Sequence, residues 1–189
     1  LGMTANASGN GAVAIGPVAK SSGEAGVAIG IASQASAKKT IAMGSVATAT
    51  AQNATAIGSG AKADGKDAVV LGTDSLVQDT DSIAIGKGAT VKSDTLGVSQ
   101  NSIAFGTNAK VKGGNSTAIG WDADTGDGSS MLAIGVGAST NNTSAGSANS
   151  QSVALGTRAQ AFGDQAIAIG GDVKASGNSS VAIGGDDID

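Results

Sequence analysis

The side chains that most often carry chemistry in proteins are missing from this chain. The 189-residue sequence contains no Cys, no His and no Tyr. Histidine is the usual general base and metal ligand near neutral pH, and it commonly activates a Ser or Cys nucleophile. The composition therefore argues against an enzyme, while the absence of Cys leaves the redox compartment open. A net charge of −4 argues against a nucleic-acid-binding protein.

One segment imitates a nucleotide site. Residues 60–67 read Gly-Ala-Lys-Ala-Asp-Gly-Lys-Asp and resemble a phosphate-binding loop. Asp67 stands where a Ser or Thr would bind magnesium, and no helix pattern follows. We therefore expect no nucleotide and no other cofactor.

Two acidic clusters suggest calcium: Asp122, Asp124 and Asp127, and Asp186, Asp187 and Asp189. The first departs from a calcium-binding loop, because Gly126 stands one position early and Ala133 replaces the bidentate Glu. We expect solvated turn carboxylates and no metal site.

A repeat of 14 residues must position every side chain of this protein. A short apolar phrase ends in glycine twelve times, and most of the closing glycines are 14 residues apart: Gly16, Gly30, Gly44, Gly58, Gly72, Gly86, Gly106, Gly120, Gly135, Gly156, Gly170 and Gly184. A fixed period predicts stacked units that contact mainly their neighbours. Such a stack displays surface and does not naturally enclose a reaction.

The residues before each closing glycine predict a strand that is apolar on both faces. Large, mostly β-branched side chains stand one and three residues before the glycine, so they share one face of a strand. We expect this row inside the coil. The small residue between them then faces outward, and we expect it to meet another copy of the chain. These trimer-interface candidates are Ala14, Ala28, Ala42, Ala56, Val70, Ala84, Ala104, Ala118, Ala133, Ala154, Ala168 and Ala182.

A second short strand is predicted after each closing glycine. Small residues stand three and five positions later and are expected to face inward, with a polar residue between them on a wet outer face. Positive φ is expected at the closing glycine and at a Gly or Asp seven residues later. Helix is not expected, because Gly recurs too often and no 3.6-residue period is present.

Three stretches interrupt the period, near residues 87–100, 121–130 and 136–150. Insertions in solenoids become surface loops, often on a binding face. Neutral sequence drift in turns that tolerate insertions explains these stretches equally well.

A few outward positions are candidates for ligand contact: Lys20, Lys62, Lys110, Lys174, Trp121 and Phe162. The four lysines share one position of the repeat and could form a broken basic stripe, although scattered surface charge more often serves solubility. The aromatic residues could anchor a ligand, but packing against an inserted loop is the favoured interpretation.

The repeated phrase resembles a known signature. Residues 115–120 read Asn-Ser-Thr-Ala-Ile-Gly, and residues 101–106, 151–156 and 179–184 are close variants. They resemble the N-S-V-A-I-G motif of YadA-like heads in trimeric autotransporter adhesins, and the insertions resemble UspA-like heads. The resemblance implies an all-β fold, a left-handed parallel β-roll in a homotrimer, with residues 1–189 as a single head domain of about 13 turns.

The resemblance also implies a role. Such heads stand on a stalk at the bacterial cell surface, anchored in the outer membrane, and bind host extracellular matrix proteins (fibronectin, laminin or collagen) or host cell receptors. The sequence starts at Leu1 and has no run of roughly 20 apolar residues, so we expect the stalk and anchor outside this segment.

Other functions remain open. A purely structural spacer needs the same repeat and no ligand. An ice-binding or surface-binding solenoid needs a regular Thr array, whereas the outward column here mixes Lys, Gln, Thr and Asp. A solenoid acyltransferase needs a six-residue period and typically a His, and neither is present.

Overall fold

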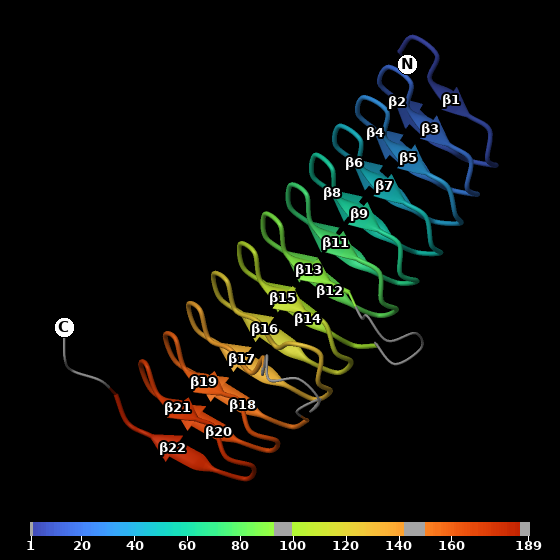
Figure 1. The fold of residues 1–189 in the computed structure, drawn as a ribbon. Coiled ribbons are helices and arrows are strands. Elements are labelled where there is room, and N and C mark those ends of the chain that lie inside the picture. The colour runs from blue at the N-terminus through green and yellow to red at the C-terminus, as the bar shows by residue number, and fades with distance from the viewer. Residues whose placement is uncertain (1, 93–99, 142–149, 186–189) are drawn as a thin grey trace. The chain divides into compact units, whose positions relative to one another are not determined.

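The computed structural model describes residues 2–92, 100–141 and 150–185. Their regular secondary structure is all strand, and within these ranges no helix could cross a membrane. The chain divides into two compact units, residues 1–90 and 91–189. Each unit is a parallel β-solenoid with two separate rows of short strands (Figure 1). The predicted β-solenoid is confirmed, while the single head domain over 1–189 stays a prediction.

Each turn contributes a three-residue strand that ends at the residue before the closing glycine. In the first unit these strands are β2 (Val13–Ile15), β4 (Val27–Ile29), β6 (Ile41–Met43), β8 (Thr55–Ile57), β10 (Val69–Leu71) and β12 (Ile83–Ile85). In the second unit they are β14 (Ile103–Phe105), β16 (Thr117–Ile119), β17 (Leu132–Ile134), β18 (Val153–Leu155), β20 (Ile167–Ile169) and β22 (Val181–Ile183).

Two-residue strands form the opposite wall of the coil. In the first unit these are β1 (Asn6–Ala7), β3 (Lys20–Ser21), β5 (Gln34–Ala35), β7 (Thr48–Ala49), β9 (Lys62–Ala63) and β11 (Leu76–Val77). Strand β13 (Thr90–Val91) stands where the chain passes from one unit to the next, and β15 (Lys110–Val111), β19 (Gln160–Ala161) and β21 (Lys174–Ala175) follow in the second unit.

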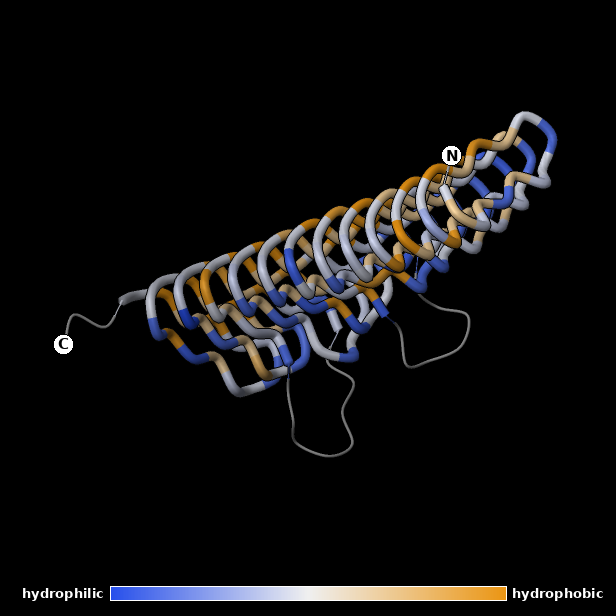
Figure 2. The backbone as a smooth tube through the Cα atoms, turned by 90° about the horizontal axis from the view of Figure 1, so that it is seen from above, coloured by the Kyte–Doolittle hydropathy of each residue, from blue (hydrophilic) through white to orange (hydrophobic). Residues whose placement is uncertain are grey.

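The strands pair so that residues at the same position of the sequence repeat lie next to one another in successive turns. Ala28 pairs in parallel with Ala42, and the neighbouring residues of β4 and β6 pair in the same order. The extra residues between β17 and β18 do not disturb this register, since Ala133 pairs with Ala154. Hydrophobic segments therefore recur at equivalent places in successive turns of each unit (Figure 2). Parts of two predicted insertions, residues 93–99 and 142–149, lie outside the described residues.

The core of the coil is built from small side chains, and this overturns one prediction. The central residue of each three-residue strand points into the coil and not outward. In a single chain these residues are fully or almost fully buried, apart from the half-buried last one: Ala14, Ala28, Ala42, Ala56, Val70, Ala84, Ala104, Ala118, Ala133, Ala154, Ala168 and Ala182. They cannot form the trimer interface, because their own coil already covers them.

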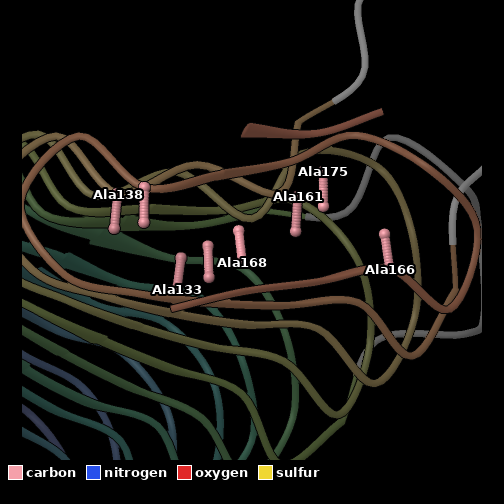
Figure 3. Close-up of a cluster of buried hydrophobic side chains, with 8 residues drawn as sticks. Ala133, Ala138, Ala161, Ala166, Ala168 and Ala175 are labelled. Atoms are coloured by element: carbon pink, nitrogen blue, oxygen red, sulfur yellow. The ribbon is translucent and has the colours of Figure 1, made fainter. Parts of the chain in front are cut away.

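The two walls of the coil lie close together, and the buried side chains between them are mostly Ala, Ser and Thr, with Val at a few positions such as Val70 and Val77. Figure 3 shows Ala133 and Ala168 on one wall pointing toward Ala138 and Ala161 on the other. The predicted inward residues after each closing glycine are buried as expected, for example Ala47 and Ala49. Small side chains therefore meet small side chains across the interior, and the large Val and Ile row is forced to the outside.

Glycine is required at two places in a turn for different reasons. Gly58 has φ +135°, and an added Cβ would lie 2.6 Å from the carbonyl carbon of Gly72 in the next turn. Gly65, seven residues after Gly58, lacks the predicted positive φ. Its Cβ would instead lie 2.5 Å from the carbonyl carbon of Asp79, so close approach of the next turn excludes a side chain there.

Positive φ falls at two other places in each turn. It occurs two residues after the closing glycine, as at Val46 (φ +58°), and five residues before it, as at Asn53 (φ +59°). Left-handed backbone suits Gly, Asn and Asp, whereas a β-branched residue there is strained. The repeat therefore accepts strain at some corners and avoids it at others.

Candidate functional site

The most extensive candidate surface is a row of side chains on the three-residue strands, which are large and apolar except at Thr55 and Thr117. We call this row the apolar face; it comprises the residues one and three positions before each closing glycine. In the single chain these side chains are exposed or half-buried: Val13, Ile15, Val27, Ile29, Ile41, Met43, Thr55, Ile57, Val69, Leu71, Ile83 and Ile85 in the first unit, and Ile103, Phe105, Thr117, Ile119, Leu132, Ile134, Val153, Leu155, Ile167, Ile169, Val181 and Ile183 in the second.

The exposure of this face is unusual for a monomeric protein. Leu71 is 43% exposed and Phe105 is 50% exposed. Single exposed apolar residues are normal, but a contiguous strip of them marks an interaction surface. The apolar face therefore has the character of an interface.

A second column of small residues in the sequence indicates this arrangement. Four residues before each closing glycine stands another mostly small residue, such as Thr40, Ala54 or Ala68, and all three are buried. It lies two positions from the central Ala and so shares its side of the strand. Two small columns on the same side indicate the thin interior, and the large row must then face outward.

The first edge of the coil is the second surface of interest. We define it as the two residues that follow each closing glycine. Backbone hydrogen bonds join this edge from turn to turn, for example from the Gly60 N–H to the Ser45 carbonyl at 2.9 Å. The edge therefore presents its side chains on a fixed ladder of backbone.

Within each unit, the candidate lysines share one column of the coil but do not follow one another in successive turns. Within the first unit, Lys20 and Lys62 occupy the outer wall three turns apart, with Gln34 and Thr48 between them in the same column. In the second unit, Asp124 is the direct neighbour of Lys110 in this column. Isolated charges on a wet wall are consistent with solubility rather than with one basic site.

The two candidate aromatic residues lie in different surroundings. Trp121 is 57% exposed on the first edge, and its carbonyl accepts a 2.8 Å hydrogen bond from the Gly137 N–H of the next turn. Phe162 is half-buried, and the Lys174 Nζ lies 5.4 Å from its ring centroid. Phe162 therefore has a cation–π partner in its own unit, and Trp121 is the more available of the two.

The phosphate-loop candidate, residues 60–67, consists of strand β9 (Lys62–Ala63) and parts of the turns on either side of it. In the first acidic cluster, Asp122 and Asp127 lie in turns and Asp124 forms a β-bridge. The Asp124 carboxylate accepts hydrogen bonds from the Gly126 N–H at 2.8 Å and from the Asn141 side chain at 3.1 Å. Among the residues that the structure describes, no three acidic side chains converge where they could hold a metal ion. Asp186, Asp187 and Asp189 lie outside the described residues.

Polar side chains one turn apart form ladders along the surface. The Asn53 side chain donates a 2.7 Å hydrogen bond to Asp67, which together with Lys66 lowers the pKa of the Asp67 carboxyl. Arg158 donates two hydrogen bonds to Asp172 and likewise lowers the pKa of that carboxyl. These contacts tie successive turns together.

Comparison with known proteins agrees with this architecture. The YadA head domain repeat (2 copies) matches more than half of the chain, in overlapping segments: residues 1–19, 21–47, 35–61, 49–75, 63–89, 99–123, 148–172 and 174–186. No curated protein matches the sequence.

A solved structure is also similar. It is the crystal structure of the collagen-binding domain of the Yersinia adhesin YadA, with a TM-score of 0.60 and 26% sequence identity. The alignment covers 95% of this chain and 84% of that one. Together, the repeat match, the 14-residue register and the small-residue interior show that the chain belongs to the YadA head domain family.

Proposed function

We propose that this chain is the head of a homotrimeric bacterial adhesin, in which the apolar faces of three copies pack together around a common axis. The observation that carries the proposal is the apolar face itself, which recurs in every turn and is left uncovered by the single chain. Packing against identical copies removes that surface from water. Membership of the YadA head family supports the choice of three copies.

The proposed subunit interface is the apolar face, and not the column of central Ala residues that the sequence pattern predicted. A small Ala column permits close approach, but it already fills the coil. The Val and Ile row is larger and buries more apolar area, so it contributes more to association.

Adhesion follows from repetition and not from a catalytic site. Three chains present the same shallow surfaces several times over, so weak contacts to a repetitive matrix fibre add up through effective concentration. The similar Yersinia domain is described as collagen-binding. We therefore propose an extracellular matrix protein as ligand, with collagen tested before fibronectin, laminin and host cell receptors, and a location at the bacterial surface held by an outer-membrane anchor.

Light scattering with two matched variants tests the assembly. Wild-type protein should have the mass of three chains, and Ile57→Asp should shift it toward one chain, because a carboxylate would be buried in the interface. Lys62→Asp, which changes an exposed residue on the outer wall of the same unit, should remain a trimer. A wild-type mass of one chain, or an unaffected Ile57→Asp trimer, contradicts the proposed packing.

Solid-phase binding to immobilised collagen, fibronectin and laminin tests the ligand. The wild-type trimer should bind at least one of them far more strongly than Ile57→Asp, since the single chain loses multivalency. Lys62→Asp serves again as the assembly control. A trimer that binds none of the three supports the alternative of a structural spacer.

A further inference from the structure

The first edge is apolar at the N-terminal end of the first unit. Met3 is 83% exposed, Ile31 57%, Val46 52% and Val18 47%, and the exposed Pro17 lies beside Val18. We call these five residues the edge patch. No charged residue stands on the first edge in these four turns.

The same edge is polar or lacks a side chain further along the first unit. The equivalent residues are Ser59 and Gly60, then Thr73 and Asp74, then Lys87 and Gly88. The repeat itself therefore does not require apolar residues here. Within the first unit, the apolar stretch of the edge is therefore an addition to the repeat that covers four turns.

Two residues of the edge patch adopt a backbone conformation that disfavours them. Val18 has φ +59° and Val46 has φ +58°. Left-handed backbone is a clear outlier for a β-branched residue, and later turns place Gly60 and Asp74 at the same position. Strain that the fold does not need points to a function at the surface.

The edge patch is also held rigidly. The Val18 N–H donates to the Met3 carbonyl at 3.0 Å, and the Val46 N–H donates to the Ile31 carbonyl at 2.8 Å. These backbone groups are thus hydrogen-bonded between successive turns, and the apolar side chains of the edge patch are the surface that a partner would remove from water. A partner needs apolar surface and no hydrogen-bonding edge of its own.

We propose that the edge patch of one copy packs against the apolar face of a second copy. This inference rests on the proposed trimer and adds its contact geometry. A closed ring of identical chains with head-to-tail contacts needs two different complementary surfaces on each chain. The first four turns offer two, since the apolar face is separated from the edge patch by a closing glycine alone, as between Ile29 and Ile31.

The opposite edge of the same turns does not fit the edge patch. It carries Glu24 and Lys38, whose charged groups lie 3.0 Å apart, and it also carries the exposed Lys39. Packing Lys39 and the Glu24–Lys38 ion pair against Ile31 and Val46 would remove charged groups from water, and an apolar partner offers them no hydrogen bonds in return. The apolar face of the neighbouring copy is the better partner.

Cysteine cross-linking tests the contact, because the natural chain contains no Cys. In Val27→Cys/Ile31→Cys one residue lies on the apolar face and the other on the edge patch. Val27 lies in strand β4 and Ile31 in the turn that follows it. A disulfide within one chain leaves the mass of a single chain on a non-reducing gel, whereas disulfides between copies give a covalent trimer, which is the product we expect after mild oxidation. Val27→Cys/Lys38→Cys, which uses the opposite edge, should stay uncross-linked.

Dissociation on dilution gives an independent measurement. Ile31→Asn/Val46→Asn should raise the concentration at which the trimer dissociates by at least about tenfold. Thr73→Asn/Asp74→Asn changes the same edge outside the edge patch and should leave that concentration unchanged.

The outcomes separate this inference from the proposed function. A wild-type trimer that shows neither the cross-link nor the dilution effect overturns the edge-to-face contact, leaves the trimer proposal standing and makes an external apolar partner the occupant of the edge patch. Cross-linking through Lys38→Cys also overturns it. A wild-type mass of one chain overturns both proposals.

Discussion

The interior of the coil and its first edge obey opposite rules. Every turn places the same kind of small residue inside, and the central strand residues from Ala28 to Ala168 are fully buried. The first edge, in contrast, varies in residue type: Val46 and Asp74 stand two residues after their closing glycines, and Trp121 stands one residue after its own. The interior is fixed by the distance to the opposite wall, whereas the edge only has to turn the chain. Packing therefore restricts the residue types inside each turn, whereas the residue types on the first edge are free to vary and can determine binding specificity.

A charge placed in the interior should have the largest effect. Ala56→Asp would bury an uncompensated carboxylate between the two walls, with an expected loss of more than about 3 kcal/mol in the free energy of unfolding. Urea denaturation followed by circular dichroism measures it. Ile57→Asp, one residue along, should keep the coil folded while it loses assembly. Equal unfolding of both variants would erase the distinction between inside and outside.

A methyl group at a closing glycine should have the next largest effect. Gly58→Ala combines a positive φ with overlap on the next turn, so we expect a loss of at least about 2 kcal/mol in the free energy of unfolding. Gly11→Ala isolates the φ effect, since Gly11 has φ +66° and open space, and should cost about 1 kcal/mol. Gly171→Ala has neither problem and should be neutral. Thermal melts at fixed protein concentration rank the three, and a neutral Gly58→Ala would contradict the close stacking of turns.

A change of residue type at a strained corner should have a smaller effect of opposite sign. Lys39 has φ +56°, and the equivalent corner in the next turn carries Asn53. Lys39→Asn should stabilise the fold by about 0.5–1 kcal/mol, because Asn adopts left-handed backbone more readily. The reverse change, Asn53→Lys, also removes the hydrogen bond to Asp67 and should destabilise. Denaturation midpoints that do not move would show that these corners are not strained.

Acid titration of a surface ladder should show the smallest effect. Arg158 lowers the pKa of Asp172 below its ordinary value of 3.8. A lowered folded-state pKa adds stability above the unfolded pKa, and this contribution disappears as the pH falls through the folded-state pKa. Arg158→Gln should therefore reduce stability slightly at pH 6 and make no difference near pH 2, as melting temperatures across that range will show. A difference that persists at pH 2 would mean that Arg158 acts through packing and not through Asp172.

Much of the fold could be predicted because the repeat fixes the register. Strand β6 is where the sequence places it, Ala28 pairs with Ala42, and Ala47 and Ala49 face inward as expected. The left hand of the coil follows from the family resemblance and stays a prediction. The candidate interface was wrong, because a large row and a small row alternate and the apolar pattern suits either orientation. The ligand-contact candidates were residues of unusual type, whereas the edge patch consists of ordinary Val, Ile, Pro and Met.

The amino-acid order by itself determined the period, the parallel pairing and the separation of large from small residues onto opposite sides of each strand. Tertiary structure decided which side became the interior. Alternation says only that neighbours point in opposite directions. The side with the smaller residues became the interior, because the two walls of one coil pack mostly Ala with some Val between them, and this narrow interior is a property of the folded turn.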